Sequence, residues 1–316
     1  MSANIVVVGS LNMDLVIRAA HIPKPGETIL GTDFQTIPGG KGANQAVAAA
    51  RLGGKVSMVG RVGEDPFAKV LLQNLKTVGV DVNHIQSDPD AASGVALIVV
   101  DDRGENSIVV GSGANMLLSE KDVEAAESVI SDADVLVMQL EVPLEVVIRA
   151  AGIARANDVV VILNPAPARS LPTELLDLVN ILVPNESETA LLSGLPARSQ
   201  TELETAASFL LDSGIQTVVI TMGNRGALMA DSKKVKLFEA YEVQPVDTTA
   251  AGDAFVAGLG VALGNGKTLP EAVRWGNAAG ALATLRFGAQ TSLPMDVEVS
   301  QMLAGEKPVV IIGRKT

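Results

Sequence analysis

The sequence of 316 residues contains no cysteine, which excludes disulfide bonds, thiolate catalysis and cysteine-type zinc sites. Its two histidines, His21 and His84, lie far apart in the chain and suggest no histidine metal cluster. Aromatic residues make up only 3% of the chain. The core must therefore be built from aliphatic side chains.

Positive charge is also scarce. The net charge is −12 and no basic stretch is present, which argues against binding to nucleic acids or anionic membranes. No apolar run approaches the ~18 residues needed to span a bilayer. The N-terminal NIVVVG is too short for the apolar region of a signal peptide and is typical of a first strand. We expect a soluble, cytoplasmic protein.

Short apolar segments alternate with amphipathic ones along the whole chain. The predicted strands are NIVVVG, KVSMVG, DVLVMQL, DVVVILN, NILVPN and QTVVIT, and helical patterns such as PFAKVLLQNLKTVG and LETAASFLLDSG lie between them. Hydrophobic residues reach 47%, so a large core can be buried. This alternation predicts an α/β fold with a mostly parallel sheet covered by helices.

Two regions interrupt the alternation. DLVIRA with ETILG (14–31), and GVALIVVDDRGENSIVV (94–110), are predicted strand pairs without an intervening helix. Such antiparallel insertions often form a lid or an oligomer surface. The alternative is an edge hairpin of the main sheet, because mixed sheets are common.

Polar residues follow several predicted strands, where ligands of doubly wound sheets bind. Asn12 and Asp14 follow the first strand, and on an extended segment their side chains point the same way. A carboxamide and a carboxylate together are suited to bind a pair of sugar hydroxyls. Glu141, which ends another predicted strand, could provide a third contact. Taken singly, each is also a plausible helix cap or loop residue.

PGGKGANQAVAAARLGG (38–54) is a glycine-rich turn that opens an alanine-rich helix. It is not a Walker A loop, because Lys41 is followed by glycine and the glycine spacing is wrong. Gly40 and its neighbouring glycines allow close approach of the backbone to a ligand. Lys41 and Asn44 would then project near the helix start. The alternative is simply a tight strand-to-helix connection.

PNESE places Asn185 and Glu188 three residues apart at an apparent helix start. This spacing fits a capping box. It fits equally well a pair of polar groups that orders water around a hydrated Mg²⁺ ion.

TMGNRGALM reads as a strand, a turn with two glycines, and a second strand. Thr221, Gly223 and Gly226 could border a nucleotide, with Arg225 near its phosphates. A plain hairpin turn is equally consistent.

VDTTAAGDAFVAGLGVALG (246–264) places two carboxylates, Asp247 and Asp253, around a group of small residues. The first-turn N–H groups of the following helix, from about Ala250 to Asp253, would form an anion site suited to a phosphate. The alternative for Asp253 is a helix cap. Asp247 implies a second polar requirement close by.

Together these motifs resemble a known family. GGKGANQAVAAARLG and DTTAAGDAFVAGL are similar to the two signatures of the ribokinase-like (PfkB) carbohydrate kinases, and PNESE matches that family's Asn-x-x-Glu motif. The likeness runs in order from GSLNMD to GAQTSLP, over nearly the whole chain. It implies one domain, 1–316, with a three-layer α/β/α sandwich. It also implies a small inserted β-sheet lid from about 12–40 and 93–112.

The resemblance implies phosphorylation of D-ribose at O5 with ATP as donor. Asp253 would be the base, and the backbone N–H groups of Ala250, Ala251 and Gly252 would form the anion hole. The family motif usually has glycine where this chain has Ala250. The residues expected to hold ribose are Asn12, Asp14, Gly40, Lys41, Asn44, Glu141 and Asp253. Those expected to line the ATP site are Asn185, Thr221, Gly223, Arg225, Gly226, Gly252 and Asn277.

The resemblance further implies Mg²⁺, with Glu188 nearby, and activation by a monovalent cation, normally K⁺. The expected cation ligands are the Asp247 carboxylate, Ser292, and the carbonyls of Thr249, Ala283, Arg286 and Gly288. A homodimer formed through the lid is also implied.

Three alternatives remain at this stage. The same chemistry could serve another sugar, such as 2-deoxyribose, fructose or a keto-deoxy sugar acid. A nucleoside substrate is disfavoured, because aromatic residues that could stack on a base are scarce. A non-catalytic sugar or nucleotide sensor could use the same scaffold, although such a protein would not need to keep AAGD, Lys41 and the Asn185/Glu188 pair.

Overall fold

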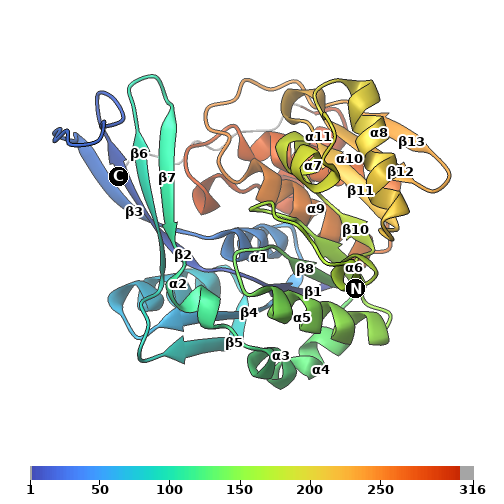
Figure 1. The fold of residues 1–316 in the computed structure, drawn as a ribbon, viewed down its shortest axis with the longest axis horizontal. Coiled ribbons are helices and arrows are strands. Elements are labelled where there is room, and N and C mark those ends of the chain that lie inside the picture. Colours follow the sequence, from blue (N-terminus) through green and yellow to red (C-terminus); the bar gives the residue numbers. More distant parts are fainter. Residues whose placement is uncertain (1, 307–316) are drawn as a thin grey trace.

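The computed structural model describes residues 2–306, in which a nine-stranded sheet lies between two layers of helices (Figure 1). The strand order is β13-β12-β11-β10-β9-β8-β1-β4-β5. Neighbouring strands are parallel except for β12, which is antiparallel to both β11 and β13. The strands are β1 (Asn4–Val8), β4 (Lys55–Gly63), β5 (Asp81–Asp88), β8 (Val135–Met138), β9 (Val160–Leu163), β10 (Ile181–Leu182), β11 (Thr217–Thr221), β12 (Ala227–Asp231) and β13 (Val235–Phe238). The sequence-based prediction of a mostly parallel α/β sandwich is confirmed.

The helices divide between the two faces of this sheet. One face carries α1 (Lys41–Arg51), α2 (Pro66–Thr77), α9 (Ala251–Gly264), α10 (Leu269–Ala283) and α11 (Asp296–Leu303). The other carries α3 (Glu120–Ala125), α4 (Glu127–Ser131), α5 (Leu144–Ala156), α6 (Thr173–Leu176), α7 (Glu186–Ser193) and α8 (Gln200–Asp212). Each face has its own aliphatic core.

Strand β1 shows how the sequence supplies both cores. Ile5 and Val7 belong to the core on the α1 face, whereas Val6 and Val8 belong to the core on the α5 face. Side chains alternate between the two faces of a strand, so a strand buried on both sides must be apolar throughout. This explains the continuous apolar run NIVVV.

A second, four-stranded sheet stands apart from the main sheet (left in Figure 1). Its order is β3-β2-β6-β7, from β3 (Asp33–Gly39), β2 (Asn12–Arg18), β6 (Gly94–Val100) and β7 (Asn106–Gly111). Strands β2 and β6 are parallel, and the two outer pairs are antiparallel. The inserted strands therefore form a separate small sheet and not an edge of the main one.

The partner of β2 differs from the expected one. The sequence suggested ETILG (27–31), but the strand that pairs with β2 is β3, with Arg18 opposite Asp33. Residues 19–32 form the connection, in which the Glu27 side chain accepts a hydrogen bond from the Lys24 N–H at 2.9 Å. The segment PKPG within it cannot extend a ladder, because proline lacks the N–H that a paired strand donates.

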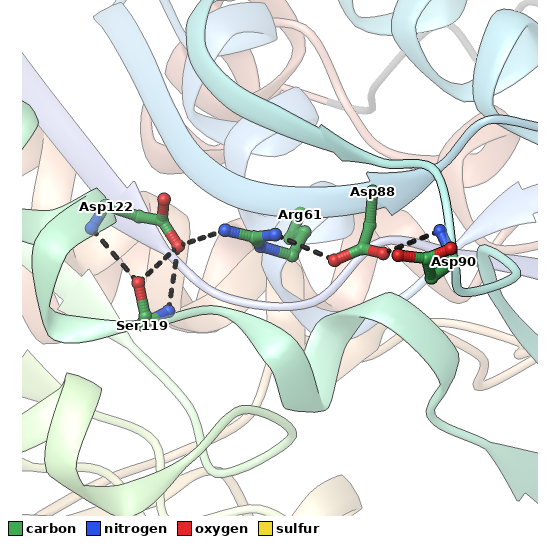
Figure 2. Close-up of polar contacts among 5 residues, drawn as sticks. All are labelled: Arg61, Asp88, Asp90, Ser119 and Asp122. Carbon is green, nitrogen blue, oxygen red and sulfur yellow. Dashed lines mark hydrogen bonds and ion pairs between the residues drawn. The ribbon is translucent and has the colours of Figure 1, made fainter.

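A charged cluster joins β4 to the elements that flank the β6–β7 hairpin in the chain (Figure 2). Arg61, in β4, donates to Asp88 at 2.8 Å and to Asp122 at 2.7 Å. Burial acts to raise the pKa of Asp122, but hydrogen bonds from Arg61 and Ser119 outweigh it and hold that pKa below its usual value. Asp88 also accepts from the Asp90 N–H at 3.0 Å. Arg61 therefore links β4 to the end of β5 and to the first turn of α3, the two elements that flank the β6–β7 hairpin in the chain.

Within residues 2–306 no helix has the length and apolar character required to cross a membrane. The C-terminal KPVVIIGRKT, whose role the sequence alone left open between an edge strand and an interface segment, lies outside the described residues.

Candidate active site

The glycine loop before α1 packs directly on the backbone that follows β1. Gly40 caps α1 with a φ of 89°, in the left-handed region. A Cβ atom on Gly40 would lie 2.6 Å from the backbone nitrogen of Asn12, and one on Gly42 would lie 2.6 Å from that of Ser10. Real Cβ contacts are longer than this. These glycines therefore allow the first turn of α1 to reach the end of β1.

Asp253 lies in the first turn of α9, and its carboxylate is buried against α1. Asn44 donates its Nδ2–H to Oδ2 of Asp253 at 3.0 Å, and Gln45 donates its Nε2–H to Oδ1 at 3.0 Å. One amide thus holds each carboxylate oxygen. The structure thus brings together Asn44 and Asp253, both of which were expected to hold the sugar, whereas the contact from Gln45 was not foreseen.

Glu141, in the segment after β8, places its carboxylate against the start of α1. Its Oε2 accepts from the Ser10 hydroxyl at 2.5 Å and from the Lys41 backbone N–H at 3.3 Å. The Ser10 Oγ in turn accepts from the Gly42 N–H at 3.3 Å. A serine directly after β1 therefore links Glu141 to the glycine loop.

Charged groups gather in front of this loop. Burial, together with the negative charges of Glu141 and Asp253, raises the pKa of Asp14 to about 7. Burial acts to lower the pKa of Lys41, but the charges of Asp253, Glu141 and Glu188 more than compensate and raise it. The carboxylates of Asp14, Glu141 and Asp253 thus lie near enough to one another and to Lys41 for their charges to interact.

Asn12 is oriented by Asn115, a residue that sequence analysis did not single out. The Asn115 Nδ2–H donates to Oδ1 of Asn12 at 2.7 Å, and Asn115 also bonds the carbonyl and N–H of Leu11 at 3.1 and 2.9 Å. Both asparagine side chains are buried. Asn115 lies in the turn after β7, so the small sheet contributes to the placement of Asn12.

Helix α9 begins with a residue in an uncommon conformation. Ala250 has a φ of 59° and a ψ of 10°, a left-handed conformation that costs a residue with a Cβ roughly 1–2 kcal/mol. The Ala251 N–H donates to the Thr248 carbonyl at 3.2 Å. The N–H groups of Gly252 and Asp253 have no acceptor among the described residues. The helix start thus offers free donors beside the Asp253 carboxylate.

Asn185 and Glu188 form the capping box of α7. Oδ1 of Asn185 accepts from the Glu188 N–H at 2.8 Å, and Oε2 of Glu188 accepts from the Asn185 N–H at 2.8 Å. Burial raises the pKa of Glu188, although the Asn185 N–H and the Lys41 charge oppose this. The cap thus also holds the Glu188 carboxylate near Lys41. Within residues 2–306 no cluster of three or more potential metal-ligating side chains is present.

The turn after β11 and helix α10 both contact the backbone at the end of β13. Gly226 has a φ of 88°, and a Cβ there would lie 2.0 Å from the Phe238 carbonyl oxygen. Asn277, in α10, donates its Nδ2–H to the carbonyls of Phe238 and Glu239 at 3.4 and 3.3 Å. Gly226 and Asn277 therefore border the same short segment after β13.

Thr221 and Gly223 lie with Asn185 along one groove between β11 and α7. Thr221 pairs with Asn185 in a parallel bridge. Arg225 extends from the same turn, but its guanidinium forms an ion pair with Glu186 at the start of α7. The structure thus brings three of these predicted nucleotide contacts together and places Arg225 beside them.

Asp247 organises the loop between β13 and α9. Its Oδ1 accepts from the N–H and hydroxyl of Thr249 at 2.9 and 2.6 Å, and its Oδ2 accepts from the Gly288 N–H at 2.9 Å. Burial acts to raise the pKa of Asp247, but these hydrogen bonds and the Arg18 charge hold it below its usual value. Asp247, Thr249 and Gly288 thus lie in one loop cluster with an ionised carboxylate.

The other predicted cation ligands lie between the end of α10 and the start of α11. Ala283 ends α10 and is buried. The Arg286 side chain turns away to pair with Glu298 in α11. The Ser292 hydroxyl is buried and donates to the Ala289 carbonyl at 2.8 Å. An ionised carboxylate together with backbone and hydroxyl oxygens is a donor set suited to a hard cation.

Comparisons with known proteins agree with this geometry. The model of the pfkB family of carbohydrate kinases matches residues 2–296. A ribokinase of Haemophilus influenzae is 44% identical over 303 residues, which cover 96% of this chain and 99% of the relative. A deoxyribokinase of Salmonella typhi is 39% identical over 254 residues, covering 80% and 83% of the two chains.

Among solved structures, a ribokinase of Arabidopsis thaliana in complex with ribose and ATP superposes with a TM-score of 0.89 at 33% identity. The match covers 96% of this chain and 99% of that one. The chain therefore belongs to the pfkB family of carbohydrate kinases.

Proposed function

We propose that this protein transfers the γ-phosphoryl group of ATP to O5 of D-ribose, giving D-ribose 5-phosphate and ADP. The observation that carries the proposal is the Asp253 carboxylate, buried at the start of α9 beside free N–H groups and opposite the acceptor-rich ends of β1 and β8. The names of the similar ribokinases, and the ribose and ATP in the Arabidopsis thaliana complex, support it.

Asn44 is suited to hold both the base and the sugar. Its Nδ2–H binds Asp253, while its buried Oδ1 has no hydrogen-bond partner among the described residues. A buried acceptor without a donor is costly, so a sugar hydroxyl that donates to Oδ1 would gain the full benefit. Asn12, Asp14, Lys41 and Glu141 complete the set that grips the remaining hydroxyls.

In the transfer, Asp253 takes the proton of the 5-hydroxyl as the O5–Pγ bond forms and the bond from Pγ to the leaving ADP oxygen breaks. Charge on the moving phosphoryl group is stabilised by the free N–H groups at the start of α9. Lys41, whose pKa is raised, brings a positive charge to the same side. Mg²⁺ would screen the phosphates, and Glu188 would hold its water shell.

The direct test is a phosphorylation assay with Mg·ATP and a panel of D-ribose, 2-deoxy-D-ribose, D-fructose and a keto-deoxy sugar acid. We expect the highest kcat/KM for D-ribose, with the 5-phosphate as product. A second candidate is phosphorylation of 2-deoxyribose, which the 39% identical deoxyribokinase favours. Ligand binding without turnover on any sugar would indicate a sensor and contradict both.

We further propose that the loop cluster around Asp247 binds K⁺ and that the cation supports the start of α9. In Asp247→Ala, activation by K⁺ is expected to disappear, because the anchoring carboxylate is lost. Initial rates measured from 0 to 100 mM KCl, with ionic strength held constant by a tetraalkylammonium salt, report this directly. The highest of these concentrations lies below the physiological ionic strength of about 0.15 M.

Asp231→Ala is the matched control. Asp231 also caps a turn, accepting from the N–H groups of Lys233 and Lys234 at 2.8 and 3.1 Å, but it lies in the β12–β13 hairpin. This variant should keep the K⁺ response of the parent. If Asp247→Ala retains an unchanged K⁺ requirement, the cation assignment is wrong.

The small sheet is proposed to pair with that of a second copy of the chain. Phe34, Leu97 and Val109 are large, exposed apolar side chains whose strand positions share one face of it. Apolar patches of this kind mark protein interfaces, and identical copies usually meet about a two-fold axis. A sheet covered in this way could close over the sugar site as a lid.

Val109→Lys should shift the protein from dimer to monomer in sedimentation equilibrium, because it places a charge within the proposed interface. Val297→Lys changes an equally exposed valine, 59% against 64%, on α11. It should leave the mass unchanged. A parent protein that sediments as a monomer at all concentrations would contradict the proposal.

A further inference from the structure

The amide of Gln45 approaches Asp253 from inside the protein. Gln45 follows Asn44 in α1, but its side chain is completely buried. Its Nε2–H donates to Oδ1 of Asp253 at 3.0 Å, while Asn44 occupies Oδ2. The two neighbouring amides therefore differ, because the Asn44 oxygen has no hydrogen-bond partner among the described residues, whereas both ends of the Gln45 amide are engaged.

The orientation of the Gln45 amide follows from its partners. Its Oε1 accepts from the Gln139 Nε2–H at 2.6 Å, and its Nε2–H also donates to Oδ1 of Asn164 at 3.2 Å. A carboxylate can only accept, so the Gln45 nitrogen must face Asp253. Both hydrogens of this nitrogen and its carbonyl oxygen are thus engaged.

The network behind Gln45 is anchored in the main sheet. Gln139 directly follows β8 and is completely buried. Asn164 directly follows β9 and donates its Nδ2–H to the Val183 carbonyl at 2.9 Å. The position of the Asp253 carboxylate is thereby tied to the ends of two central strands, in addition to its own helix.

We infer that Gln45 is a positioning residue for phosphoryl transfer, an inference that rests on the proposed role of Asp253 as base. Gln45 keeps Oδ1 of Asp253 engaged throughout turnover and so fixes the plane of the carboxylate. Oδ2, which accepts from Asn44, has a second lone pair with which to accept from the 5-hydroxyl of the sugar. Reactions of this kind depend on placement, and a displacement of ~1 Å in the reacting groups can cost about 100-fold in rate.

The principal test is Gln45→Met, which keeps the side-chain length and removes the donor. We expect kcat to fall by about tenfold to a hundredfold. The KM for ribose and that for ATP should each stay within roughly threefold of the parent, because Gln45 has no exposed atom. A change confined to KM would overturn the inference.

A double-mutant cycle separates positioning from a general structural effect. In an Asp253→Asn background, Gln45→Met should cause little further loss of kcat, because the group it positions is no longer a base. The same fold loss in both backgrounds would overturn the inference. The single variant Asp253→Asn tests whether Asp253 is the base. A failure of the proposed function is therefore distinguished from a failure of the inference about Gln45.

Two further variants guard against simple misfolding. Gln139→Met removes an equally buried amide that does not touch Asp253, and it should lose less activity than Gln45→Met. An equal loss would assign the effect to disruption of the network and overturn the inference.

In Gln45→Glu, a protonated carboxyl can still donate to Asp253 but an ionised one repels it. The kcat ratio of Gln45→Glu to parent should therefore rise from pH 8 to pH 6, and a constant ratio would contradict the role of the donor.

Discussion

Asp253→Asn is expected to lower kcat by about 10²- to 10⁴-fold while ribose binding is largely kept. The substitution removes the group that takes the proton from the 5-hydroxyl but preserves the shape of the side chain. One of the amides of Asn44 and Gln45 must rotate, because the new Nδ2 cannot accept from either. The rate is measured by ADP release and the affinity for ribose by calorimetry.

Asp296→Asn is the matched control for this change. Asp296 also lies in the first turn of a helix, α11, where a negative charge interacts favourably with the helix dipole. If Asp253 acted only through such a charge effect, the two variants would behave alike. We expect Asp296→Asn to keep the parent kcat. An Asp253→Asn enzyme as fast as the parent would remove Asp253 from the mechanism.

The alternation of apolar and amphipathic segments predicted the main sheet well, because strands buried on both faces leave a strong apolar signal. It failed for β3, whose sequence DFQTIPG carries little hydrophobic signal and whose side chains are mostly exposed. The partner of β2 is set by register, with Asn12 opposite Gly39, and not by apolar content. A strand that is mostly exposed in a small sheet lacks the hydrophobic pattern by which strands are predicted from sequence.

The site was predictable where a residue type stands out from its surroundings. Asp253 and Asp247 are charges within an apolar segment, and Lys41 is a charge among glycines. Gln45 and Asn115 were missed because polar residues on helices and turns are usually at the surface. The sequence held one signal for Gln45. It lies in a helix composed largely of alanine, and a helix without a polar face is expected to be buried, together with any polar residue in its middle.

For Asn185 and Glu188, sequence analysis left two readings open, and the structure shows that the first of them is present. The pair is a capping box, and the same geometry leaves the Glu188 carboxylate close enough to Lys41 and Asp253 for their charges to affect its pKa. A capping motif in the sequence therefore does not argue against a functional role. The role of such a pair depends on its distances to residues in other elements. A local sequence pattern carries no information about those distances.

Gly40→Ala is expected to raise the KM for ribose by about 100-fold and to destabilise the fold by more than the ~1–2 kcal/mol that a left-handed alanine costs. The new Cβ would lie 2.6 Å from the Asn12 nitrogen and 3.0 Å from the Ser10 carbonyl oxygen, and both are backbone atoms that cannot move aside. Relief requires α1 to shift, and Asn44 and Gln45 would shift with it. Initial rates at varied ribose and a thermal melt measure the two effects.

Gly53→Ala separates these causes, because it lies just beyond the other end of the same helix. Gly53 has a φ of 87°, nearly that of Gly40 at 89°, but a Cβ there meets nothing within 4 Å. It should show only the backbone cost of ~1–2 kcal/mol, with kinetic constants close to those of the parent. Equal kinetic effects in the two variants would mean that strain, and not the contact of α1 with the end of β1, accounts for the loss. The glycine at position 40 would then have no specific role in placing the sugar-binding residues.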